Sequence, residues 1–210
     1  MTCIRILSAL CALSVLLGQG AWPPLAHADH GGMGGAHSAP AQSPPAAQSP
    51  ASSYFGDIPL VNQNGEQMRF YSDLLRGKVV VIHSFFSGCE GSCPVVIDTF
   101  ARVQDWLGER LGTQVYLLSL SVDPETDTPA TLKAYAERLK AKAGWYFLTG
   151  EKPNVERALF KLGQYVEDRE SHSNVILIGN DATGLWKKAF GLASPEEIIR
   201  LVESVLQDRG

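Results

Sequence analysis

The fold is decided by an apolar run and by the two cysteines that follow it, Lys78-Val-Val-Val-Ile-His-Ser-Phe-Phe86 and then Ser87-Gly-Cys-Glu-Gly-Ser-Cys-Pro94. The first run is apolar without alternation, which is typical of a strand covered on both faces. Pro94 suits the first turn of a helix. The sequence therefore predicts that Cys89 and Cys93 lie on the loop that joins a buried strand to a helix.

Strand and helix patterns alternate through the rest of the chain. Strands are predicted at 59–62, 67–71, 78–86, 114–122, 145–148, 175–179 and 185–190, and helices at 72–75, from 94, at 128–142, at 154–166 and from 194. Thr128-Pro129 and the capping box Ser194-Pro-Glu-Glu197 mark two helix starts. This order predicts a mixed β-sheet with helices on both faces and an N-terminal β-hairpin. A cysteine pair at the end of the first central strand narrows the prediction to a thioredoxin-like fold.

Residues 1–28 have the features of a signal peptide. Arg5 is a minimal basic region, residues 6–18 are an apolar region too short to span a bilayer comfortably, and Ala26-His-Ala28 is a cleavage signal. We expect cleavage after Ala28 and export, to the periplasm if the source is bacterial, with an uncleaved membrane anchor as the alternative. Cleavage would remove Cys3 and Cys11 and leave only the pair at 89 and 93.

Residues 29–53 are a low-complexity segment that should be a disordered linker, because they contain no Leu, Ile, Val or Phe to bury. His30, Met33 and His37 offer donors suited to transient copper pickup, although such residues also occur in tails without a role. The folded domain should span residues 54–210. The net charge of −4 provides no basic surplus and argues against nucleic acid as a partner.

The two cysteines form the candidate chemical site. Backbone N–H groups and the helix dipole at such a loop favour thiolates, and two thiolates are a soft donor set that suits Cu(I). A structural disulfide is the weaker interpretation, because closing so short a loop adds little stability. Two sulfurs alone would leave the ion exposed, so a third ligand is expected.

His172 is the best candidate for that ligand. It precedes the predicted strand at 175, and in a thioredoxin-like sheet the loop that enters this hairpin lies beside the cysteine loop. An imidazole would complete a three-coordinate site and also tolerates Cu(II). His83 lies within the buried strand and is interpreted as a hydrogen-bonded core residue. Asp123 is either a turn residue or a residue that supports the site.

Four ordered blocks resemble the signature of the Sco/SenC family, namely Phe85-Phe-Ser-Gly-Cys-Glu-Gly-Ser-Cys-Pro94, Ser121-Val-Asp-Pro-Glu-Thr-Asp-Thr-Pro129, Trp145-Tyr-Phe-Leu-Thr-Gly150 and His172-Ser173. The resemblance covers roughly the whole folded domain. It implies a thioredoxin-like fold and copper ligation by Cys89, Cys93 and His172. It also implies a role in assembling the dinuclear copper centre of cytochrome c oxidase, as copper donor, as thiol reductant, or both.

The sequence departs from the family pattern at two places. Glu90 follows the first cysteine where the family usually has proline, which adds like charge beside two thiolates. Ser171 precedes the histidine where aspartate is usual, so one expected orienting group is lost. We expect Asp168 or Glu170 to take its place.

These observations favour an exported metallochaperone whose partners are the copper-site subunit of a membrane-bound cytochrome c oxidase and a thioredoxin-like reductant. The alternative is a thiol–disulfide oxidoreductase that uses Cys89 and Cys93 as a redox pair. Ordinary reductants of this kind use two intervening residues rather than three, which argues against this as the sole role. A peroxidase of related fold is weaker still, because the sequence places no arginine beside the cysteines.

Overall fold

The computed structural model describes residues 50–91, 93–172 and 174–210. The helices are α1 Pro50–Phe55, the π-helix η1 Phe70–Leu75, α2 Cys93–Leu107, the 3₁₀ turn η2 Gly108–Arg110, α3 Pro129–Arg138, α4 Lys152–Leu162, the 3₁₀ turn η3 Arg169–Ser171 and α5 Pro195–Leu206. The strands are β1 Pro59–Asn62, β2 Gln67–Arg69, β3 Val79–Phe85, β4 Val115–Ser121, β5 Trp145–Thr149, β6 Val175–Asn180 and β7 Leu185–Phe190.

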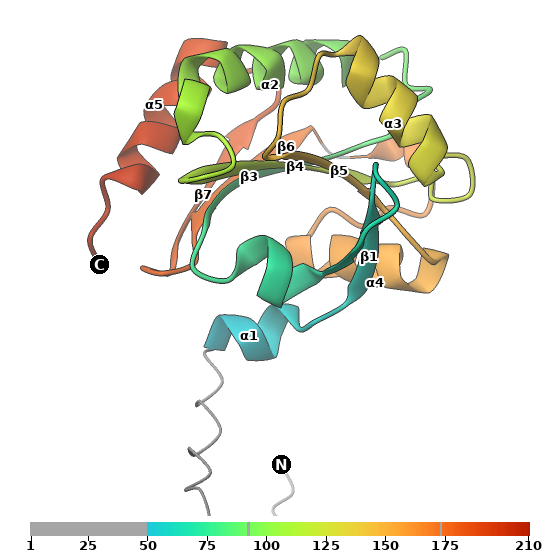
Figure 1. The fold of residues 1–210 in the computed structure, drawn as a ribbon, viewed down its shortest axis with the longest axis horizontal. Coiled ribbons are helices and arrows are strands. Elements are labelled where there is room, and N and C mark those ends of the chain that lie inside the picture. The colour runs from blue at the N-terminus through green and yellow to red at the C-terminus, as the bar shows by residue number, and fades with distance from the viewer. Residues whose placement is uncertain (1–49, 92, 173) are drawn as a thin grey trace, which may run out of the picture. The chain divides into compact units, whose positions relative to one another are not determined.

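The strands form one seven-stranded mixed sheet in the order β2-β1-β5-β4-β3-β6-β7. Helices α2, α3 and α5 cover one face, and α1, η1 and α4 cover the other (Figure 1). Each face has its own apolar core, because buried residues of the sheet point alternately into the two layers. This confirms the predicted mixed sheet with helices on both faces and a hairpin, β1–β2, at its N-terminal end.

The centre of the sheet determines where the loops meet. Every residue of β3 is buried, as a strand covered on both faces requires. β3 runs parallel to β4, with Phe85 opposite Ser121, and antiparallel to β6. The end of β3, the end of β4 and the beginning of β6 therefore lie at the same edge of the sheet. The loops that carry Cys89, Asp123 and His172 all leave from this edge.

Four predicted boundaries are wrong. The strand predicted at 67–71 ends at Arg69, because Phe70 and Tyr71 are the first residues of η1. Residues 50–53, predicted to be disordered, belong to α1, which is held to the domain because Phe55 packs against Phe70 and Trp186. The helix predicted at 128–142 ends at Arg138, and Lys140 has a left-handed backbone. The helix predicted at 154–166 is α4, which ends at Leu162 because Gly163 adopts the left-handed C-terminal cap.

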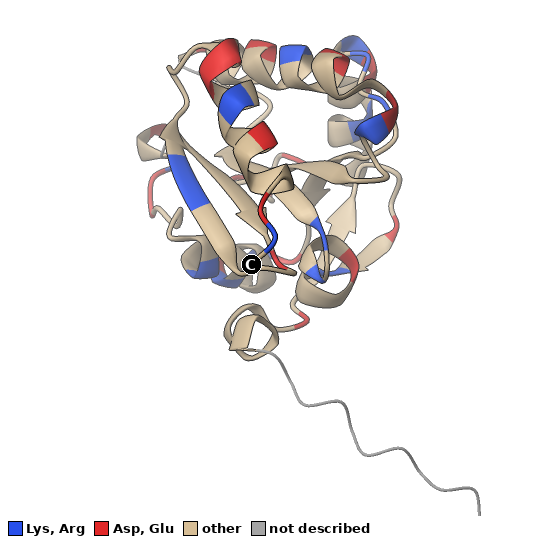
Figure 2. Ribbon diagram, turned by 90° about the vertical axis from the view of Figure 1, so that its left-hand side faces the viewer, with Lys and Arg blue, Asp and Glu red and all other residues tan. Residues whose placement is uncertain are grey.

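The predicted signal peptide and most of the predicted linker, including His30, Met33 and His37, lie outside the described residues. Among the residues that are described, no helix has both the length and the apolar character needed to cross a membrane. Figure 2 shows basic and acidic residues interspersed over the outer helices, while the outer strand β7 carries Lys187 and Lys188. Lysines on such an edge disfavour pairing with another chain.

Candidate metal centre

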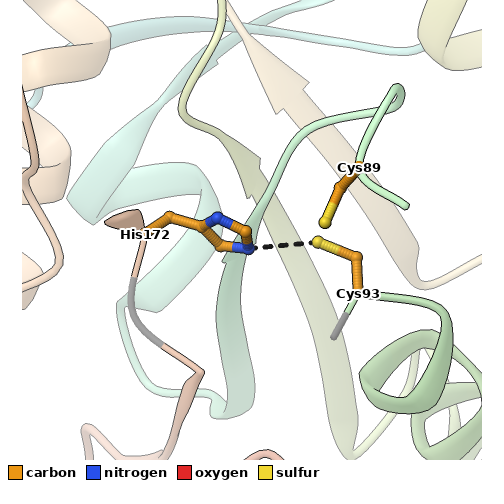
Figure 3. Close-up of side chains that lie close together, drawn as sticks. All are labelled: Cys89, Cys93 and His172. Atoms are coloured by element: carbon orange, nitrogen blue, oxygen red, sulfur yellow. Dashed lines mark hydrogen bonds between the residues drawn. The ribbon is translucent and has the colours of Figure 1, made fainter. Parts of the chain in front are cut away.

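The structure brings together the three predicted ligands, Cys89, Cys93 and His172. Their sulfur and nitrogen ligand atoms all lie within 4.8 Å of one another. Cys89 comes from the loop after β3, Cys93 is the first residue of α2, and His172 follows η3 (Figure 3). The two cysteines are not joined in a disulfide. Three segments far apart in the chain therefore present two soft sulfurs and one imidazole to a common point.

The hydrogen bonds of His172 determine which ring nitrogen faces the sulfurs. Its Nδ1 lies 2.8 Å from the carbonyl oxygen of Arg169, and its Nε2 lies 3.1 Å from the Sγ of Cys93. A carbonyl only accepts hydrogen bonds, so Nδ1 carries the proton and Nε2 is left with a free lone pair. The Cys93 thiol donates to that lone pair, which a metal ion would also use.

The expected orienting carboxylates are not the groups that orient the imidazole. Asp168 caps η3 by accepting from the backbone N–H of Glu170, and Glu170 lies 3.6 Å from the guanidinium of Arg169. The backbone carbonyl of Arg169 instead holds Nδ1 of His172. The prediction that Asp168 or Glu170 replaces the missing aspartate is therefore wrong. The tight turn of η3 places the carbonyl oxygen of Arg169, rather than a carboxylate, against Nδ1 of the ring.

The predicted preference for thiolate is also wrong for Cys93 in the metal-free protein. Burial raises the pKa of Cys93 to about 12, and the hydrogen bond and charge of Cys89 act in the same direction. Backbone hydrogen bonds with Phe86 and with Cys93 itself oppose the rise without reversing it. Cys93 is only 2% exposed, so water contributes little to stabilising its anion. A soft metal would replace the thiol proton and supply the missing positive charge.

Phe86 and Arg169 pack beside the histidine. The rings of Phe86 and His172 meet edge to face, with 5.5 Å between centroids. The Arg169 guanidinium lies over the Phe86 ring, 5.2 Å from its centre, and forms an ion pair with Asp123. Asp123 also accepts backbone hydrogen bonds from Thr126 and Asp127 through its carbonyl oxygen. Asp123 is therefore both a turn residue and a residue that supports the site.

Asp127 is a buried carboxylate beside the cysteine loop that the sequence pattern did not single out. Its side chain is 1% exposed and accepts hydrogen bonds from the backbone N–H and the hydroxyl of Ser87 and from the hydroxyl of Ser121. Burial raises the pKa of Asp127, and the hydrogen bonds from the two serines oppose that rise. In the sequence, Asp127 is marked only by its position just before the helix cap at Thr128, four residues after Asp123.

His83 is confirmed as a buried core residue. Its Nδ1 lies 3.2 Å from the carbonyl oxygen of Ser84, so its Nε2 accepts from the hydroxyl of Ser119 at 2.7 Å, and the oxygen of that hydroxyl accepts from the indole N–H of Trp145 at 2.9 Å. Burial lowers the pKa of His83 to about 3, so the ring is neutral at physiological pH. It packs against Phe100, with 4.2 Å between ring centroids, and takes no part in the group of three ligands.

Comparison with known proteins agrees with this geometry. Residues 46–207 match the sequence model of the SCO1/SenC family. A SCO2-like protein of Rickettsia felis is 28% identical over 162 residues, which are 70% of this chain and 75% of that protein. BsSco, described as a Sco-family cytochrome c oxidase assembly protein with a disulfide switch, is 28% identical and superposes with a TM-score of 0.59 over 72% of this chain and 92% of its own.

The copper-bound structure of Bradyrhizobium japonicum ScoI shares the fold, with a TM-score of 0.60 and 24% identity over 71% of this chain and 98% of its own. These matches confirm the thioredoxin-like fold that the sequence predicted. The family match spans nearly the whole of the described domain, including both cysteines and the histidine. The chain therefore belongs to the SCO1/SenC family.

Proposed function

We propose that this protein binds copper through Cys89, Cys93 and His172 and passes it to a copper site of another protein, the dinuclear centre of cytochrome c oxidase. The observation that carries the proposal is the convergence of three donor atoms within 4.8 Å of one another. Two thiolates and a neutral imidazole suit Cu(I), and the imidazole also accepts Cu(II). Copper-bound relatives of the same fold support the choice of metal.

The site combines one buried ligand with one that solvent and a partner protein can reach. Transfer of a cargo metal requires such an accessible ligand. Cys93 is buried at the start of α2, whereas Cys89 is partly exposed and is followed by the exposed residues Glu90 and Gly91. When Cu(I) binds, each thiol gives up its proton and forms a copper–sulfur bond. Transfer begins when a sulfur of the recipient binds the ion from the open side and displaces Cys89. Recipient ligands then replace His172 and Cys93, and both cysteines regain their protons.

A second function, reduction of a disulfide in the recipient site, is favoured by the different exposure of the two cysteines. Cys89 is the accessible nucleophile and would form a mixed disulfide with one partner sulfur, releasing the other. Cys93 would then attack Cys89, and the Nε2 of His172, 3.1 Å away, would accept its proton. The partner leaves as a dithiol and this chain keeps the disulfide, so two electrons have moved. The peroxidase alternative gains no support, because the nearby Arg169 is bound to Asp123.

Copper binding is tested by titrating the reduced, metal-free chain with Cu(I) in the absence of oxygen against a chromophoric chelator. We expect one ion per chain and a loss of affinity in Cys89→Ser, in Cys93→Ser and, by about tenfold to a hundredfold, in His172→Ala. Asp98→Asn on the exposed side of α2 is the control and should bind as the native chain does. Binding that is unchanged in all three ligand variants would overturn the proposal.

The recipient is tested separately by mixing the copper-loaded chain with the soluble copper-site domain of a cytochrome c oxidase. If copper is transferred, the recipient domain acquires the absorption of its copper-loaded form. If this chain acts as a reductase, free thiols appear in the recipient domain without metal transfer. Insulin reduction by the metal-free chain distinguishes a general reductant from one that needs this recipient. If this mixture shows no copper transfer and no thiol reduction, the oxidase is excluded as the partner.

We also propose export to the periplasm with cleavage after Ala28, on the basis of the pattern in residues 1–28. N-terminal sequencing of the chain recovered from an expressing bacterium tests this proposal. A first residue of Asp29 in the periplasmic fraction is expected. An intact N-terminus in the membrane fraction would favour the uncleaved anchor instead.

A further inference from the structure

Two carboxylates of the loop between β4 and α3 contact the two segments that carry the metal ligands. Asp127 reaches the loop that carries the cysteines, and Asp123 reaches the segment that carries the histidine. None of the three metal ligands belongs to this loop. Its contacts therefore suggest a role that is distinct from ligation.

Asp127 holds the cysteine loop through Ser87, two residues before Cys89. One oxygen of Asp127 lies 3.1 Å from the backbone nitrogen of Ser87, and the Ser87 hydroxyl donates to the other oxygen. The carboxylate is almost completely buried, so these hydrogen bonds have little competition from water. Beside them, the N–H of Val122 donates to the carbonyl of Phe85 at 2.8 Å. The start of the cysteine loop is thus tied to the end of β4.

Asp123 holds the histidine segment through Arg169. The guanidinium of Arg169 forms an ion pair with Asp123 at 2.5 Å, while the carbonyl oxygen of the same arginine accepts the proton of His172 Nδ1 at 2.8 Å. The Asp123 side chain is only 12% exposed. The pairs formed by Asp98, Asp105 and Glu125 are more than half exposed on both sides, so solvent weakens them more.

Asp127 is joined to the backbone of Asp123 by hydrogen bonds, one of which passes through Ser121. The Ser121 hydroxyl donates to Asp127 at 2.6 Å and accepts the backbone N–H of Asp123 at 3.0 Å. The backbone N–H of Asp127 donates to the carbonyl of Asp123 at 2.9 Å. The two aspartates therefore belong to one hydrogen-bonded turn.

We propose that Asp123 and Asp127 are positioning residues that together set the distance between the histidine nitrogen and the sulfur pair. Asp127 fixes the sulfurs through Ser87, and Asp123 fixes the imidazole and its tautomer through Arg169. The inference rests on the proposed copper binding for its effect on affinity, while its structural part concerns the metal-free protein.

The test is a set of double-mutant cycles. It uses the chain as purified from the expressing cells, with no further truncation. Asp123→Asn, Arg169→Gln and Asp127→Asn are each made in the native and the His172→Ala backgrounds, and Cu(I) affinity is measured by chelator competition. Asp98→Asn is the matched control, because it removes an exposed ion pair from α2. Thermal unfolding of each variant is recorded; Arg169 is half exposed, so its replacement leaves the core intact.

We expect Asp123→Asn and Arg169→Gln to lower the affinity about tenfold in the native background and to have no further effect once His172 is absent. Asp127→Asn should lower it in both backgrounds, because its effect passes through the cysteine loop. Nitrogen NMR of the metal-free chain supplies an independent readout: His172 should be protonated at Nδ1 in the native protein and in Asp98→Asn, and a mixture of tautomers in Arg169→Gln.

Two results would overturn the inference. One is an unchanged tautomer together with unchanged affinity in Asp123→Asn and Arg169→Gln. The other is an equal loss of affinity in both backgrounds for these two variants, since a general loss of structure would act in that way. If the native chain binds no copper, the proposed function fails, and the tautomer of His172 in Arg169→Gln still decides this inference.

Discussion

The sulfur of Cys93 and the Nε2 of His172 lie 3.1 Å apart although 79 residues separate them in the chain. Their approach follows from the antiparallel pairing of β3 with β6, which places the exit of one strand beside the entrance of the other. The loops then need only a few residues to bring the two side chains together. The chemistry of the site thus depends on the sheet order more than on either loop alone.

The difference in exposure between the two cysteines predicts an order of alkylation. At neutral pH Cys93 is a buried thiol with its pKa raised to about 12, whereas Cys89 is partly exposed. Iodoacetamide should modify Cys89 before Cys93, and Cys93 in the Cys89→Ser variant should react about tenfold or more slowly than Cys89 in the Cys93→Ser variant. Mass spectrometry of quenched samples gives both rates, and equal rates would contradict the burial of Cys93.

Copper supplies the control for this experiment. Loading the native chain with one equivalent of Cu(I) should protect both sulfurs, because each would be bound to the metal. Protection of only one cysteine would show that the other is not a ligand.

His83 predicts a dependence of stability on pH. Its pKa is lowered from 6.5 to about 3 in the folded protein, so the unfolded chain binds the proton more readily. This contribution to stability is complete above pH 6.5 and is lost as the pH falls from 6.5 towards 3, by at most about 1.4 kcal/mol per pH unit. Urea unfolding of the native chain and of His83→Gln between pH 7 and pH 4.5 should show a smaller loss in the variant. The same slope in both proteins would assign the acid sensitivity to other groups.

Gly191 lies where the histidine segment meets the cysteine helix. A Cβ at this position would be 2.7 Å from the carbonyl oxygen of Asn174 and 2.7 Å from a methyl of Val96. Gly191→Ala should therefore push β6 and α2 apart, lower the free energy of unfolding by roughly 1–3 kcal/mol and weaken Cu(I) binding. Gly91→Ala is the control, since a Cβ there meets nothing within 4 Å although it lies between the two cysteines. Chemical denaturation and chelator competition measure both effects.

Gly144 tests the packing of the two loops that precede β4 and β5. It has φ of +97°, and a Cβ would lie 2.4 Å from the backbone nitrogen of Gly112. Gly144→Ala should destabilise the fold by about 2 kcal/mol or more, because the strained backbone and the clash add. Gly65→Ala separates the two causes, since Gly65 has φ of +81° in open space and should cost only about 1 kcal/mol. Equal losses in the two variants would mean that the close approach to Gly112 contributes nothing.

The sequence was most informative where a local pattern has a single physical cause. The continuous apolar run at 79–85 is a fully buried strand, and the hydroxyls of Thr128 and Ser194 accept hydrogen bonds at the starts of α3 and α5 as predicted. The three candidate metal ligands could be named for two reasons. Cysteines are rare in this chain, and the predicted thioredoxin-like sheet places the cysteine loop and the His172 loop at the same edge.

The features that could not be predicted depend on distant contacts or on the balance of two local effects. The dipole of α2 favours a thiolate at Cys93, yet the apolar surroundings of the sulfur outweigh it, and burial is invisible in a spacing pattern. Asp127 gains its importance from Ser87, forty residues earlier in the chain. The helix α1 forms because Phe55 packs against Phe70 of η1 and Trp186 of β7, although Pro50, Ala51 and two serines resemble the composition of residues 29–49.

His172 comes late in the chain, just before β6, and this position constrains the order in which the protein matures. β6, which follows His172, must pair with β3 before the imidazole can reach the sulfurs. A partly synthesised chain therefore offers the two thiols of the 89–93 loop without the imidazole of His172. The complete ligand set appears only when the domain is nearly finished, so loading with copper marks chains that have folded.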